Sequence, residues 1–178
     1  MQVLSRQRGV SLIEVMMAVL IFSIGLIGLA SLMVVATRSN QAGYLRTQVT
    51  YLAHNMADRM SANPIGVWGG DYNSASYPVS TTQDCAAGCT PAQLATHDQQ
   101  MWSSQLKTFL PPGATAEIAC SKTGAGYDPV GGGQVDKRPP FGGSCAMSIN
   151  WHERSAGDKE HLNDPSVQTQ TFAWEFQP

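Results

Sequence analysis

The chain has 178 residues, with 11 Lys and Arg against 13 Asp and Glu, and a formal net charge of -2. This length suits one compact domain with an appendage. Because nucleic-acid binding needs a concentrated basic surface, a near-neutral chain with only 13% charged residues argues against bulk polyanion binding. The mean hydropathy of -0.14 is ordinary, but the apolar residues are concentrated near the amino terminus.

The first forty residues contain a long apolar run, from Val10 to Ala36, in which Glu14 is the only formal charge. About 20 apolar helical residues span a bilayer, so the run predicts a membrane helix that is retained rather than a signal peptide that is discarded. Arg6 and Arg8 precede it and, by the positive-inside rule, place the amino end in the cytoplasm. A carboxylate inside such a segment is costly, so Glu14 predicts a functional partner.

Residues 8–15, with the sequence RGVSLIEV, resemble the class III signal of type IV prepilins. That signal has a short basic leader ending in Gly, followed by an apolar helix with Glu near its start. The resemblance implies that prepilin peptidase removes residues 1–9 between Gly9 and Val10, that Val10 is N-methylated, and that residues 10–36 remain as a transmembrane and filament-core helix. It also implies that Glu14 meets the amino terminus of a neighbouring subunit, which would offset the cost of its charge. Val10 stands where Phe is commoner in the family, a departure that we expect processing to tolerate.

The helix is predicted to continue beyond the apolar run. Residues 37–63 carry apolar side chains at helical spacing and form the amphipathic half of one helix that begins near Ser11. Pro64 ends this helix, and Asn63 is expected to close its last turn. At 1.5 Å per residue the helix would be nearly 80 Å long. The side chains on its predicted inner face are Leu45, Val49, Leu52, Met56 and Met60.

Residues 64–178 are predicted to form a globular head. Residues 65–91 are expected to be loop, followed by a helix over 91–110, strands over 115–120, 145–151 and 169–176, and a glycine-rich loop over 121–143. A long helix packed on a small antiparallel sheet is an α+β fold, and with the amino-terminal signal it is type IV pilin-like. The expected helix face is Leu94, Met101, Trp102, Leu106 and Phe109 or Leu110, and the expected strand faces are Met147, Ile149 and Trp151, and Phe172, Trp174 and Phe176.

The order of landmarks resembles that of PilV-type minor pilins. These landmarks are the apolar segment 21–30, the sequence DRMSANP at 58–64, the helix ending near Leu110 before prolines, and the sequence SINW at 148–151. The likeness is strong through Pro64 and loose beyond it. It implies a type IV pilus subunit that promotes pilus assembly in a minor-pilin complex at the tip and supports twitching motility and adhesion.

The resemblance also implies partners: the other minor pilins, the major pilin, the inner-membrane assembly machinery and the lipid bilayer, without specific nucleic acid. The head would lie in the periplasm on a single-pass inner-membrane anchor and then in the pilus. Two alternatives stay open. One is a minor pseudopilin of a type II secretion system, and the other is an enzymatic or sugar-binding head on a pilin-type anchor.

Four cysteines in an exported head favour disulfides, because the periplasm is oxidising. Three pairings are possible. We prefer Cys85 with Cys89, which closes a small loop, and Cys120 with Cys145, which joins two predicted strands. A C-x3-C pair with two distant cysteines is poor evidence for zinc.

The sequence contains few other candidates for chemistry. The four histidines, His54, His97, His152 and His161, are scattered, and the charged groups at 152–154 are expected just past a strand. Asp128 and Asp136 flank the run Gly131–Gly133 and could cradle a cation, although we favour a flexible loop. Without a triad or paired carboxylates, the sequence predicts no catalytic residue, no metal, no cofactor, and a head that acts as an interaction surface.

Overall fold

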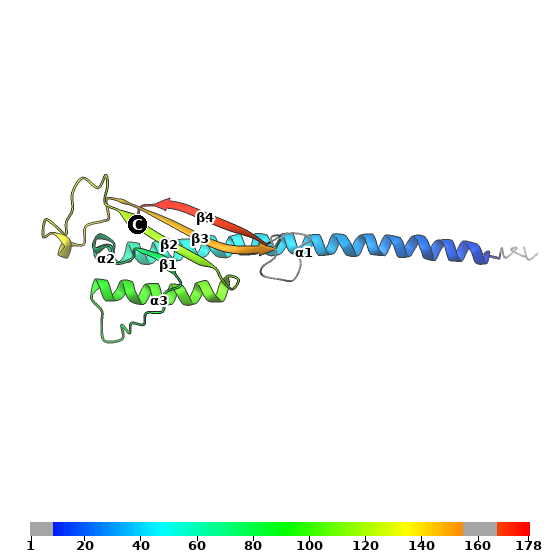
Figure 1. The fold of residues 1–178 in the computed structure, drawn as a ribbon, viewed down its shortest axis with the longest axis horizontal. Helices are drawn as coiled ribbons and strands as arrows, with labels where there is room; N and C mark the ends of the chain where they lie inside the picture. Colours follow the sequence, from blue (N-terminus) through cyan, green and yellow to red (C-terminus); the bar gives the residue numbers. More distant parts are fainter. Residues whose placement is uncertain (1–8, 155–166) are drawn as a thin grey trace, which may run out of the picture. The chain divides into compact units, whose positions relative to one another are not determined.

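The computed structural model describes residues 9–154 and 167–178. The chain divides into two compact units, the first ending at Gln41 and the second running from Ala42 to Pro178. Three α-helices, one 3-10 helix and four strands make up the described part (Figure 1). The fold is α+β, as predicted, with a long amino-terminal helix and a small antiparallel sheet.

Helix α1 is one continuous helix of 51 residues, Leu12–Ala62, close to the predicted bounds. Its buried residues all lie in its second half: Leu45, Val49, Leu52, Ala53, Met56, Ala57 and Met60. They recur every three or four residues and therefore form one face of the helix, which packs in the core of the second unit. The predicted inner face of the amphipathic half is confirmed.

The sheet has the strand order β1-β2-β3-β4, and every neighbouring pair is antiparallel. Its strands are β1 (Ser74–Tyr77), β2 (Thr115–Ser121), β3 (Ser144–Arg154) and β4 (Val167–Phe176). The three predicted strands are confirmed and are slightly longer than expected. The charged groups at 152–154 lie within β3 and not past it, because pairing with β4 extends β3 to the pair Arg154 and Val167.

The prediction that residues 65–91 are loop is wrong, because they contain helix α2 (Pro64–Gly69) and strand β1. Asn63 follows the last residue of α1 and is also the N-cap residue of α2. Its side-chain oxygen accepts a hydrogen bond from the backbone N–H of Gly66 at 3.2 Å and so caps α2, with Pro64 in the first turn. Both elements are too short to show a periodicity in the sequence.

Helix α3 runs from Pro91 to Phe109, as predicted, and begins with a capping box between Thr90 and Gln93. Trp102, Leu106 and Leu110 of the expected face are buried, as predicted, whereas Met101 and Phe109 are exposed. The face that packs inward contains polar as well as apolar side chains. Its buried residues are Ala95, Asp98, Gln99, Trp102, Ser103 and Leu106. The hydrophobic pattern therefore identified part of this face and missed its polar members.

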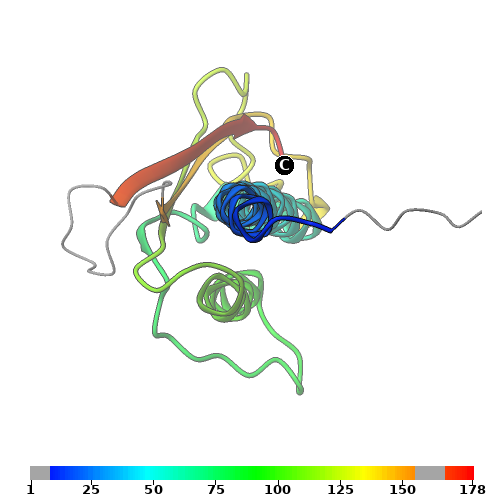
Figure 2. The ribbon, with the colours of Figure 1, turned by 90° about the vertical axis from the view of Figure 1, so that its right-hand side faces the viewer.

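The core of the second unit lies between the carboxyl-terminal half of α1, α3 and the inner face of the sheet. In Figure 2, α3 lies beside that half of α1, and the sheet passes along one flank of the two helices. The indole N–H of Trp102 donates to the carbonyl of Leu52 at 2.8 Å, which fixes α3 against α1. From the sheet, Ile118, Met147 and Ile149 are fully or almost fully buried.

Candidate functional site

The amino-terminal segment brings the predicted processing and assembly residues to the start of α1. Gly9 and Val10 are exposed and precede the helix, while Glu14 lies in its first turn. The carbonyl of Ser11 accepts the backbone N–H groups of Glu14 at 3.0 Å and Val15 at 3.3 Å. The partial positive charge of a helix amino terminus favours a carboxylate at this place.

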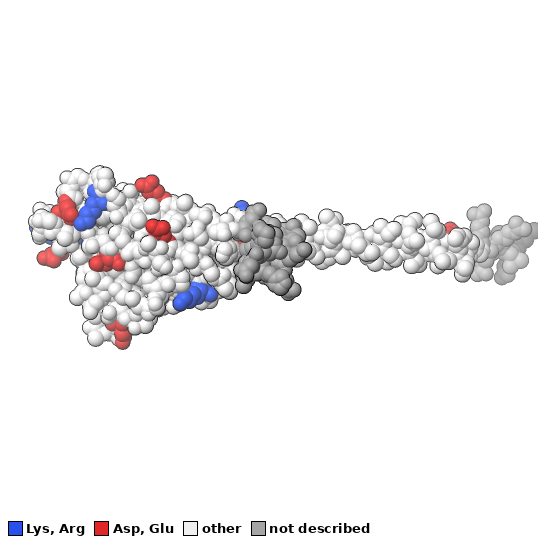
Figure 3. Space-filling model, in the orientation of Figure 1, with Lys and Arg blue, Asp and Glu red and all other residues white. Residues whose placement is uncertain are grey.

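The apolar part of α1 is a helix whose side chains pack against nothing in the described structure. Residues 9–37 are all exposed, and the most apolar stretch has a mean hydropathy of 2.6, so the helix is long and apolar enough to cross a membrane. Figure 3 shows it as a nearly uncharged surface. Its hydroxyl groups bond to the helix itself, as in the bonds from Ser23 to the Val19 carbonyl and from Ser31 to the Gly28 carbonyl, both 2.7 Å. Such a helix needs no water, and it suits lipid or an apolar partner.

A buried polar cluster ties the helices of the second unit together. Asp98 on α3 is buried, with 7% of the residue exposed. One of its oxygens accepts a hydrogen bond from the Arg59 guanidinium at 2.9 Å, and the other accepts from the Tyr72 hydroxyl at 2.7 Å. Arg59 is held in turn by the side-chain oxygen of Asn55 at 3.0 Å. Each partner is therefore oriented by a second one.

Asn63 extends the cluster from α1 to the start of α3. Its amide nitrogen donates to the Tyr72 hydroxyl at 3.1 Å and to the Pro91 carbonyl at 2.8 Å. The Tyr77 hydroxyl donates to the Tyr72 carbonyl at 3.0 Å. Since each oxygen of Asp98 accepts a hydrogen bond from another element, this arrangement links the helices of the second unit.

Burial raises the pKa of the Tyr72 hydroxyl well above its usual range, and its hydrogen bond to Asp98 raises the pKa further. Burial likewise raises the pKa of Tyr77. Both hydroxyls therefore stay protonated at physiological pH and act as donors. Sequence reasoning missed Asp98 and Tyr72, because a single polar residue on a helix or after a turn carries no pattern.

The structure contains two disulfides, Cys85–Cys89 and Cys120–Cys145, which are the pairings that the sequence favoured. The first closes a loop between β1 and α3. The second joins β2 to β3 at directly opposed positions, with the two Cα atoms 3.9 Å apart. It fixes the strands on both sides of the glycine-rich loop.

The glycine-rich loop contains an ion pair between two of its own residues. The Lys122 ammonium lies 2.9 Å from the carboxylate of Asp128, and this hydrogen bond lowers the pKa of Asp128. Asp136 lies in the 3-10 helix Val135–Lys137. Within residues 9–154 and 167–178, no group of three or more His, Cys, Asp or Glu side chains gathers as a metal ion would require.

The histidines contribute packing contacts. The ring of His54 lies 4.8 Å from that of Trp174, and His152 lies 3.3 Å from the hydroxyl of Thr169. His97 is half-buried on α3, and His161 lies outside the described residues.

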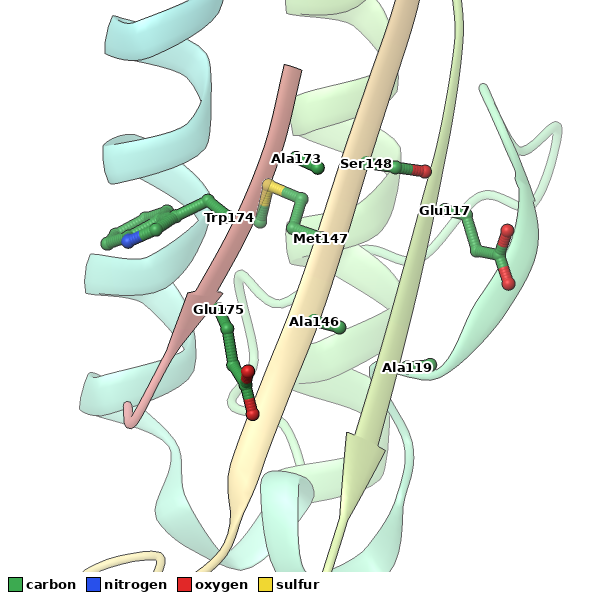
Figure 4. Close-up of a pocket in the computed structure, with 8 residues that line it drawn as sticks. All are labelled: Glu117, Ala119, Ala146, Met147, Ser148, Ala173, Trp174 and Glu175. Atoms are coloured by element: carbon green, nitrogen blue, oxygen red, sulfur yellow. The ribbon is translucent and has the colours of Figure 1, made fainter. Parts of the chain in front are cut away.

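The outer face of the sheet carries a shallow hollow of about 490 Å³. Small side chains from three strands form its floor: Ala119, Ala146, Ser148 and Ala173. Figure 4 shows Glu117 and Glu175 projecting from β2 and β4 at its two margins, and Trp174 pointing toward α1. The hollow is a wide surface with acidic margins.

Residues 4–30 match the family model described as the prokaryotic N-terminal methylation motif, and the match includes Gly9, Val10 and Glu14. It supports a type IV pilin or pseudopilin that is anchored in the membrane, processed by prepilin peptidase and assembled with pilus or pseudopilus components. It also favours a structural, non-enzymatic protein. A search of curated proteins and a search of solved structures found no match to the chain.

Replacing Asp98 tests the structural role of the polar cluster. Asp98→Ala should lower the free energy of unfolding by about 3 kcal/mol, because it leaves Arg59 and the Tyr72 hydroxyl without their shared acceptor. Urea unfolding of the full chain in detergent, followed by tryptophan fluorescence, measures this loss. The matched control is Asp58→Ala, an exposed carboxylate one residue before Arg59, which should change stability by less than about 0.5 kcal/mol. Equal losses in the two variants would contradict the assignment.

Alkaline pH should destabilise the second unit through its buried tyrosines. Above a pH of about 10 an unfolded chain loses tyrosine protons that the folded chain retains, so stability falls as the pH rises. Tyr72→Phe removes one of these groups and should make the fall less steep, although the variant is less stable at pH 7. Unfolding midpoints measured from pH 8 to 12 check the slope, and an unchanged slope in Tyr72→Phe would refute the explanation.

Proposed function

We propose that the protein is a minor pilin of a type IV pilus. Prepilin peptidase cleaves between Gly9 and Val10, and the new amino terminus at Val10 is methylated. Residues 10–36 hold the subunit in the inner membrane as a single pass with the head in the periplasm. The subunit then enters the pilus with other minor pilins near the tip, where it promotes assembly and supports twitching motility and adhesion.

The observation that carries the proposal is the methylation motif at residues 4–30, followed by an apolar helix whose side chains are unburied. A helix of this kind is soluble only in lipid or among other apolar helices, which is what transfer from membrane to filament requires. Val10 lies two residues before the start of α1 and Glu14 lies in its first turn, so the carboxylate of one subunit is placed near the depth of the freed amine of a neighbouring subunit.

In this proposal the four segments act separately: the leader 1–9, the membrane and filament-core helix 10–36, the amphipathic half 37–63 and the head 64–178. The polar cluster and the disulfides make the head rigid, and the head meets the heads of sibling subunits. The head acts by packing and not by catalysis.

The competing function is that of a minor pseudopilin in a type II secretion system, since the same motif serves both. Deleting the gene separates the two. Loss of surface pili and of twitching with intact secretion of exoproteins supports the pilin. Intact pili with lost exoprotein secretion would reject the pilin in favour of the pseudopilin.

Gly9 tests processing. Gly9→Val should leave the leader attached, with the protein in the membrane fraction and absent from sheared filaments, because the peptidase loses the residue that ends its recognition signal. Gly25→Ala is the matched control: a Cβ at Gly25 meets no atom within 4 Å, and Ala is the better helix former. Immunoblots of membrane and filament fractions provide the measurement. Assembly of Gly9→Val into filaments would refute the prepilin assignment.

A further inference from the structure

Strand β4 is the outermost strand of the sheet and differs from the strand at the opposite edge. β1 has four residues, an irregular register against β2 and Pro78 directly after it. β4 has ten residues, all in regular register with β3 from Val167 to Phe176. In Figures 1 and 2 it forms the margin of the sheet, with β3 on one side.

The register identifies which backbone groups of β4 point to the free edge. The backbone N–H of Cys120 donates to the side chain of Asn73, away from β3, and the close approach of the Cys120 and Cys145 Cα atoms is that of a pair without mutual hydrogen bonds. Cys145 therefore bonds across to its β4 partner, Phe176. By alternation, the N–H and C=O groups that point outward from β4 belong to Thr169, Thr171, Ala173 and Glu175.

The described backbone leaves this edge without a further strand. The hydrogen bonds of the turns, loops and caps in residues 9–154 and 167–178 do not involve β4. Exposed edges of soluble proteins are usually guarded by Lys, Pro or a bulge. β4 contains neither Lys nor Pro, and its pairing with β3 has no bulge.

The inner face of the same edge carries a row of aromatic side chains. Phe172, Trp174 and Phe176 pack on the core but are only partly buried, and the last two rings stack 4.6 Å apart. Every second residue of an added strand would lie beside this row and remove it from water. An extended chain with large apolar residues at alternate positions therefore fits.

The charge on the outer face of β4 favours a particular residue type on the outer face of the added strand. Glu175 is the charged residue of β4, and Glu117 is that of β2, whereas β3 carries both Glu153, which lies 4.0 Å from Arg46, and Arg154. Glu175 is exposed and lies on β4 itself. A Lys or Arg directly opposite Glu175 would form a favourable cross-strand pair, whereas an acidic residue there would be repelled.

We infer that β4 is a docking edge for an extended strand of another protein subunit, which adds to the sheet through the backbone groups of Thr169, Thr171, Ala173 and Glu175. The incoming strand places apolar residues along Phe172, Trp174 and Phe176 and a basic residue opposite Glu175. Backbone pairing supplies affinity, and the alternating side chains supply selectivity. The inference rests on the proposed function only in taking the partner from the same assembly.

The test uses the full mature chain in detergent and a designed ten-residue peptide. The peptide has valine at odd positions and threonine at even positions, except for lysine at its second position, which faces Glu175 when the peptide pairs antiparallel with β4. Amide hydrogen exchange followed by NMR should show slowing at Thr171, Ala173 and Glu175 on binding. The amides of Phe172 and Trp174, already paired with β3, should change little. No saturable binding, or protection elsewhere, would overturn the inference.

Thr171→Pro and Thr171→Ala form the matched pair of variants. Both lose the hydrogen bond from the Thr171 hydroxyl to Asn150, but only Thr171→Pro loses the outward N–H. Thr171→Pro should weaken peptide binding at least about tenfold relative to Thr171→Ala. Equal affinities would overturn the inference. The exchange pattern of the unmodified chain decides the question even if the proline variant fails to fold.

A second peptide, with glutamate in place of lysine, tests the charge. It should bind the unmodified chain several-fold more weakly, and Glu175→Gln should remove most of that difference. Identical binding of the two peptides would reject the basic partner residue. Because these measurements use purified protein, they separate failure of the docking edge from failure of the pilin assignment, which is decided by processing and by surface pili.

Discussion

The buried carboxylate of Asp98 is the constraint on which the second unit depends. Taking a charge out of water is expensive, and the cost is met only because Arg59 on α1 and Tyr72 after α2 both donate to it. Those partners are fixed in turn by Asn55 and Asn63. These bonds fix the end of the amphipathic half of α1 against α3. The sheet packs on the two helices.

The two halves of α1 differ in the surroundings that they suit. The second half of α1 is fixed by directional polar bonds and by a buried apolar face, whereas its first half has exposed apolar side chains and hydroxyls bonded to its own carbonyls. Moving an apolar helix from lipid to a contact with other apolar helices changes its hydrophobic free energy little, because neither environment is aqueous. In the proposed function, such a subunit moves from a bilayer to a filament core while its head keeps its fold.

Much of the molecule could be predicted from sequence wherever the signal was local or periodic. The methylation motif is contiguous, α1 and α3 are long, and the strands from Thr115 onward alternate clearly. Helix α2 and strand β1 were missed because six and four residues show no period, and Asp98 and Gln99 were missed on the inward face of α3 because they are polar. A contact such as Arg59 with Asp98, 39 residues apart, leaves no local pattern to read.

The central claim is that the apolar helix reaches a filament only after its leader is removed. Mass spectrometry of this protein isolated from sheared and purified surface filaments tests the claim most directly. We expect an amino-terminal peptide that begins with N-methylated Val10 and contains Glu14 in the unmodified form. Filaments that contain the protein with Met1–Gly9 still attached, or that lack the protein altogether, would contradict it.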